Sequence, residues 1–172
     1  MSFLGSKSVL AQTERPNIHN ARSFFQKITK NGGVWWNKNE KFDPKNKDDF
    51  SHFIIEFYLD EIGGLTGTIL GLNGHGEKIV FWKINEFINP SSGEVVFIQR
   101  SNFGFAVASS VFSENDTRKS EFELMYNNGG SERHRDRHYF IDENTMISES
   151  EIFNPTTKDW IKQPSQKWTR KF

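Results

Sequence analysis

Short stretches in which apolar and polar residues alternate fill most of the chain after its first helical segment. Every second residue from Phe53 to Leu59 is apolar, for example, so these side chains would share one face of a β-strand. Gly, Asn, Ser and Pro separate such stretches at intervals typical of hairpins. The pattern predicts about ten strands, at residues 34–37, 50–59, 65–72, 78–88, 94–100, 103–112, 119–126, 132–141, 145–153 and 166–171.

A different spacing precedes the strands. Between residues 17 and 30 the apolar positions recur at helical intervals and form one stripe, and an Asn-Gly-Gly sequence then supplies a helix stop. The stripe consists of Ile18, Ala21, Phe24, Phe25 and Ile28. We predict one N-terminal helix, a loose leader at residues 1–15, and a single domain over residues 16–172.

Hairpin-length connections place sequential strands side by side in an up-and-down order. An open sheet of about ten strands would leave two long edges, and closure into a barrel removes them. A two-sheet sandwich is the alternative, but its crossovers need longer connections than the sequence offers. We therefore predict a mainly β protein that forms a closed up-and-down antiparallel β-barrel of about ten strands with one N-terminal helix.

The amino-acid composition supports the prediction of β-strands and limits the classes of binding partner. The 172 residues include 17 Phe but only 7 Leu and 4 Ala, which favours pleated surfaces over helices. The 22 basic and 22 acidic residues balance to zero net charge, which argues against nucleic acid as a partner. The absence of Cys excludes disulfides, thiolate metal sites and a cysteine nucleophile. Without a long apolar run or a signal-like N-terminus, we expect no membrane span and a cytoplasmic location.

Two short motifs carry a family resemblance. Gly33-Val34-Trp35 opens the first predicted strand, and Trp168-Thr169-Arg170 lies in the last. In these motifs the chain resembles the calycin superfamily, the lipocalin and fatty-acid-binding-protein group of barrels, and most closely its small bacterial lipocalin-like domains. The resemblance implies that the first and last strands meet, with Arg170 packed on the ring of Trp35 and Gly33 beside it. Such a contact would close the base of the barrel.

Neither a metal nor a cofactor is expected. Nitrobindin-like haem barrels, which are also similar, bind iron through a His near the end of the chain, and residues 161–171 contain none. His134 and His138 would share a strand face about 13 Å apart, which is too far for one metal ion.

The segment from Arg133 to Ile141 presents two contrasting faces. Arg residues and Tyr139 alternate on one face, and His134, Asp136 and His138 are on the other. If the first face points inward, Arg137 and Tyr139 could hold an anionic ligand head, as the Arg-x-Tyr pair does in the similar fatty-acid-binding proteins. The alternative is a solvated outer face.

Aromatic residues on the other strands could supply an apolar wall around a ligand. The candidates for this wall are Trp82, Phe103, Phe105 and Phe122, with Arg100 at the mouth. The small residues of the 103–112 segment would leave space beside them.

Three functions remain open. The first is binding of a small hydrophobic or amphiphilic molecule inside the barrel, with a carboxylate as one option for its polar head. The second is an isomerase, cyclase or lyase on the same barrel, with His138, Glu56 or Glu123 as the proton-transfer group, although no catalytic motif is present. The third is a filled barrel, monomeric or homodimeric, that acts through its surface.

Overall fold

The computed structural model describes residues 16–170. It confirms the predicted fold class, because ten antiparallel strands close into a barrel and one helix precedes them. The predicted leader at residues 1–15 lies outside the described residues. None of the helices in the described part of the chain is long and apolar enough to cross a membrane.

The elements follow the predicted order closely. Helix α1 and a short 3₁₀ turn, η1, lead into eleven strands. Their bounds are α1 Pro16–Thr29, η1 Lys30–Gly32, β1 Val34–Lys38, β2 Phe50–Leu59, β3 Leu65–Asn73, β4 Lys78–Ile88, β5 Val95–Arg100, β6 Gly104–Ser113, β7 Thr117–Tyr126, β8 Ser131–Asp142, β9 Thr145–Asn154, β10 Asp159–Lys162 and β11 Gln166–Arg170.

Closure takes place around β9. Strands β1 to β8 pair in sequence, β9 pairs with β8, and β11 joins β9 to β1. The eleventh strand, β10, also pairs with β9, along the half that β11 leaves free. The pattern did not predict β10, because its four residues are too few to show an alternation.

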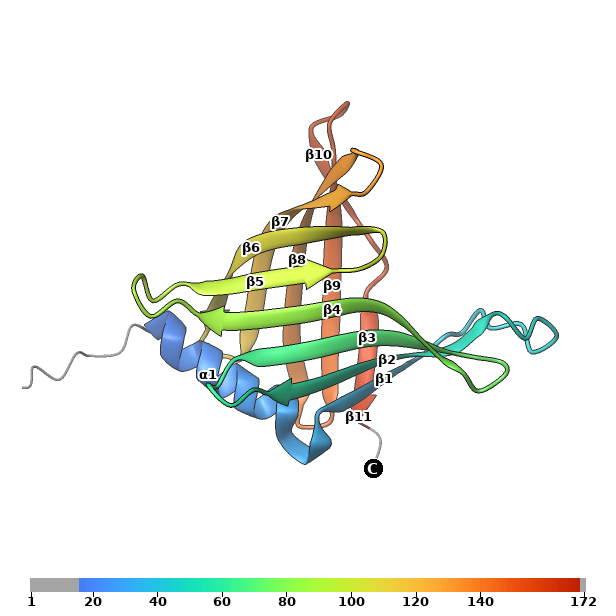
Figure 1. Ribbon diagram of the computed structural model, residues 1–172, viewed down its shortest axis with the longest axis horizontal. Helices are drawn as coiled ribbons and strands as arrows, with labels where there is room; N and C mark the ends of the chain where they lie inside the picture. The colour runs from blue at the N-terminus through green and yellow to red at the C-terminus, as the bar shows by residue number, and fades with distance from the viewer. Residues whose placement is uncertain (1–15, 171–172) are drawn as a thin grey trace, which may run out of the picture.

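Helix α1 covers one end of the barrel (Figure 1). Four of the five residues of the predicted stripe, Ala21, Phe24, Phe25 and Ile28, are buried there in one cluster with apolar side chains from the strands, and Ile18 is half-buried. The rings of Phe24 and Phe112 meet edge to face with centroids 5.3 Å apart. Aromatic packing of this kind fills the helix-covered end.

Gly33 joins this helical region to β1. Its φ of 67° is left-handed, and its carbonyl accepts a hydrogen bond of 2.9 Å from the N–H of Phe57. A Cβ added at this position would lie 2.0 Å from the carbonyl oxygen of Phe57. Glycine is therefore required where the helix end approaches β2.

Arg170 seals the same end from β11. Its guanidinium lies 4.0 Å from the ring centroid of Trp35, the residue opposite it on β1. It also donates hydrogen bonds to carbonyl oxygens at the end of α1 and in η1, and to the carbonyl of Glu143. A cation suits this place, because the last carbonyls of a helix carry partial negative charge.

Candidate functional site

Strand β8 shows which faces line the barrel. Its two faces differ in exposure, with Arg133, Arg135 and Arg137 exposed and His134 and His138 more buried. The register places His138 opposite Arg118 of β7, which is buried, and opposite Ser148 of β9. The histidine face therefore points into the barrel and the arginine face points outward.

A buried ion pair crosses the interior above the helix-covered end. Glu86 of β4 is 1% exposed and Arg118 is 6% exposed. The Nε of Arg118 donates to Oε1 of Glu86 at 2.5 Å, and the hydroxyl of Ser110 donates to the same oxygen at 2.9 Å. The guanidinium also lies over the ring of Phe97, 4.6 Å from its centroid. Both charges are thus held in place away from water.

Two buried polar atoms beside this pair lack protein partners. Oε2 of Glu86 and the hydroxyl of Ser120 have no hydrogen-bond partner within residues 16–170. Ser120 lies directly opposite Ser110 on one side and Asp136 on the other. Since buried polar groups are nearly always hydrogen-bonded, an acceptor and a hydroxyl left over in one region are unusual.

His138 continues the polar interior on β8. Its Nδ1 lies 3.0 Å from the hydroxyl of Ser148, which also accepts a 2.9 Å hydrogen bond from the indole N–H of Trp168. Burial, with a smaller contribution from the charge of Arg118, lowers the pKa of His138 to about 3. The imidazole is therefore neutral at pH 7.

Asp136 is the fourth ionisable group of this region. Burial raises its pKa above the ordinary value, and the charges of Arg118 and His134 oppose that rise. We call Glu86, Ser110, Arg118, Ser120, Asp136 and His138 the polar band. Perturbed pKa values of this kind are typical of functional sites.

Some inward-facing side chains away from the helix-covered end are less completely buried than those at that end. Trp35, Phe24 and Phe25 have almost no accessible surface, whereas the inward-facing Trp82 and Asp136 are only partly buried.

Two of the predicted wall residues, Trp82 and Phe122, pack together inside the barrel. Phe122 is buried in a cluster with Phe97 and Ala106, and Trp82 packs against the same cluster. The ring of Phe122 also stacks on the imidazole of His134, with centroids 5.4 Å apart.

The other predicted wall residues do not line the interior. Phe103 and Phe105 are 61% and 48% exposed, and Arg100 is also exposed. On β6 the inward positions belong to Gly104 and Ala106, so Phe105 points the other way. The prediction that Phe103 and Phe105 line the interior is corrected by their exposure, whereas the placement of Arg100 at a mouth stays a prediction.

Arg137 and Tyr139 lie on the outer face of β8, which corrects the inward orientation considered for them. The guanidinium of Arg137 is 3.7 Å from a carboxylate oxygen of Glu149 and 4.7 Å from the centroid of the Tyr139 ring. The inward positions of the strand are taken by His138 and Phe140, which pack within the barrel.

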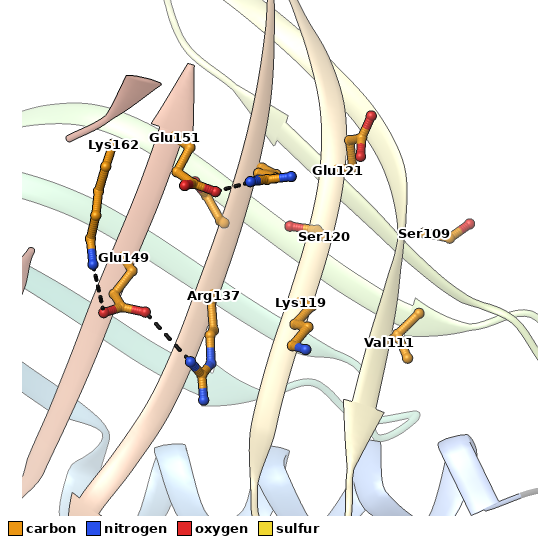
Figure 2. A pocket seen from close by; sticks show the side chains of 11 residues that line it. Ser109, Val111, Lys119, Ser120, Glu121, Arg137, Glu149, Glu151 and Lys162 are labelled. Atoms are coloured by element: carbon orange, nitrogen blue, oxygen red, sulfur yellow. Dashed lines mark hydrogen bonds and ion pairs between the residues drawn. The ribbon is translucent and has the colours of Figure 1, made fainter. Parts of the chain in front are cut away.

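These outer residues border a shallow groove of about 870 Å³ across β6 to β10. Figure 2 shows Glu149 between Arg137 and Lys162, with dashed lines to both. Most charges along the groove are neutralised by such cross-strand pairs, and Ser120 and Asp136 of the polar band are also among its lining residues.

The three residues considered for proton transfer have different surroundings. Glu56 forms an ion pair with Lys78, with 2.7 Å between the charged atoms, and its side chain is 39% exposed. Glu123 is exposed and accepts a hydrogen bond from Ser131. Of the three, His138 alone belongs to the polar band. Across residues 16–170, no group of three or more His, Asp or Glu side chains is arranged to hold a metal ion.

Sequence reasoning missed Glu86, Arg118 and Ser120. Glu86 carried a signal, because it stands between Ile84 and Ile88 at a position where the alternation predicts an apolar side chain. Arg118 fell in a segment predicted to be a polar loop, and nothing in the pattern connected it with Glu86.

Comparison of the chain with models of known protein families finds no match. Comparison with curated proteins finds none either. The closed ten-strand barrel with one helix is consistent with a calycin-like fold.

Proposed function

We propose that this protein binds a small hydrophobic or amphiphilic molecule inside its barrel. The observation that carries the proposal is the polar band, where Oε2 of Glu86 and the hydroxyl of Ser120 are buried without protein partners. Trp82 and Phe122 supply an apolar wall on the same side of the barrel. A bound molecule with an apolar body and one polar group would satisfy both features.

A barrel that is merely filled explains the polar band less well. Burial of an ion pair costs desolvation energy that apolar side chains of similar size would avoid. Unpartnered buried atoms add to that cost. The polar band therefore lowers the stability of the fold, and a role in ligand binding would explain why it is present.

Binding is favoured over turnover by the state of His138. A general base works best when its pKa is near the working pH. A pKa of about 3 makes the imidazole of His138 a weak base, although it remains a hydrogen-bonding group. We accordingly rank the isomerase, cyclase or lyase alternative second.

The proposal includes membership of the calycin superfamily, a cytoplasmic location and no haem or other cofactor. The closed barrel and the stacking of Arg170 on Trp35 support the first of these. The other two rest on the sequence alone.

Native mass spectrometry of the purified protein, followed by titration with the neutral dye N-phenylnaphthylamine, tests the proposal. We expect a co-purified small molecule or a saturable rise in dye fluorescence. Trp82→Leu should weaken dye binding several-fold because it removes part of the wall. Trp160→Leu is the matched control, since Trp160 packs on Arg135 at the outer surface. A flat titration together with an unliganded mass would overturn the proposal.

A further inference from the structure

We infer that the interior site selects a neutral ligand that carries a hydroxyl group and rejects carboxylates. The inference rests on the proposed function and adds the chemistry of the ligand's polar group. It follows from which atoms of the buried ion pair are already hydrogen-bonded and which are buried without a hydrogen-bond partner in the described part of the chain.

The carboxylate of Glu86 keeps one buried acceptor atom without a hydrogen-bond partner among the described residues. Its Oε1 already accepts hydrogen bonds from Arg118 and Ser110, while Oε2 has no partner within residues 16–170. A ligand group beside Oε2 must therefore donate a hydrogen bond. A carboxylate placed there would set two negative charges against each other with little water between them.

The positive charge of Arg118 does not offset this selection. Its guanidinium donates to Glu86 and packs over the ring of Phe97, so its charge is already balanced. An ammonium group on the ligand would approach Arg118 as a like charge. A neutral donor avoids both repulsions.

Ser120 favours a hydroxyl over other neutral donors. Its own hydroxyl lacks a protein partner and lies directly across the β6–β7 pair from Ser110, which bonds Glu86. Side chains opposite one another on such a pair have Cβ atoms about 5 Å apart. One ligand hydroxyl can donate to Glu86 and accept from Ser120, because it has both functions.

Dye displacement by three naphthalene compounds tests the inference. Naphthol, methylnaphthalene and naphthoate share one apolar body and differ in the polar group. We expect naphthol to compete at about tenfold lower concentration than methylnaphthalene, as a hydrogen bond to a charged group would provide. Naphthoate should compete least well.

Glu86→Gln should reverse the preference. The amide removes the negative charge and leaves Arg118 unbalanced, so naphthoate should now compete at least as well as naphthol. Glu149→Gln is the matched control, because Glu149 lies in the outer groove, and it should leave the order unchanged.

Ser120→Ala keeps the inference testable if Glu86→Gln does not fold. The Ser120 hydroxyl has no protein partner to lose, so the melting temperature should stay the same while naphthol binding weakens severalfold. Ser109→Ala, at the exposed Ser109 that contacts Glu94, is its control.

The outcomes separate the two proposals. Equal competition by naphthol and methylnaphthalene, or better competition by naphthoate, would overturn the hydroxyl selection and leave apolar binding intact. An unchanged order of the three compounds in a folded Glu86→Gln variant would also overturn the selection. Failure of the dye and all three compounds to bind would overturn the proposed function and the selection together.

Discussion

Two buried arginines serve this barrel in different ways. Arg170 and Arg118 are 7% and 6% exposed, and each lies against an aromatic ring. The guanidinium of Arg170 donates hydrogen bonds to backbone carbonyl oxygens at the end of α1 and in η1. Arg118 balances a carboxylate that keeps one oxygen without a partner.

The difference separates a structural site from the binding site that we propose. At the helix-covered end the groups around Arg170 satisfy one another and the surrounding side chains are fully packed. In the polar band the fold supplies the charges but leaves polar atoms unsatisfied. Burial of a charge alone is thus no sign of function, and our proposal rests on the unpartnered atoms beside the Arg118–Glu86 pair.

Substitution of Arg170 should cause the largest loss of stability. We expect Arg170→Ala to lower the free energy of unfolding by about 4 kcal/mol, because it removes charged hydrogen bonds and the stacking on Trp35. Urea denaturation measures the loss. Arg170→Lys keeps the charge but not the planar fork, and it should recover only part of the stability. Full recovery would mean that charge alone holds this end together.

Substitution of Arg118 should lower the free energy of unfolding by a smaller amount, and a second substitution at Glu86 should restore it. Arg118→Met leaves the carboxylate of Glu86 buried and uncompensated, which should cost about 3 kcal/mol. The double variant Glu86→Leu/Arg118→Met should return to within about 1 kcal/mol of the original stability, because an apolar pair replaces the ion pair. A double variant less stable than Arg118→Met would show that the pair is required for folding.

A pH effect should distinguish His138 from exposed histidines. Its folded-state pKa of about 3 lies below the ordinary value of 6.5, so the unfolded chain binds the extra proton first as the pH falls. Between pH 7.5 and 5.5 this group should remove about 1.4 kcal/mol of stability. His138→Gln should lose less stability than the original protein over this interval, by that amount. Equal losses in the two proteins would contradict the shift.

The smallest effect should come from Arg137. Its contact with Glu149 is exposed and screened by salt, so Arg137→Ala should change the free energy of unfolding by less than about 0.5 kcal/mol. Dye binding in the interior should not change either. A clear loss of dye binding would bring this outer residue back into consideration as part of the ligand site.

Much of the fold followed from local patterns. Hairpin turns and alternating residues predicted the strands, and the apolar stripe predicted the helix, because each depends on residues close in sequence. The four-residue β10 escaped because it is too short to show a period.

The candidate site was harder to predict. Residues within a strand alternate strictly, so the pattern separated His138 and Asp136 from Arg137 and Tyr139 but did not say which set faces inward. The same ambiguity affected Phe105: the sequence did not show that its side chain points outward, and the barrel does.

The sequence by itself determined that neighbouring strands pair, that one helix precedes them and that closure removes the sheet edges. Only the tertiary structure decided which face of each strand lines the interior, because that choice depends on how the closed wall packs against α1. Only the tertiary structure brought Glu86 and Arg118 together from β4 and β7. Their contact joins residues far apart in the chain, and local periodicity contains no information about such a pair.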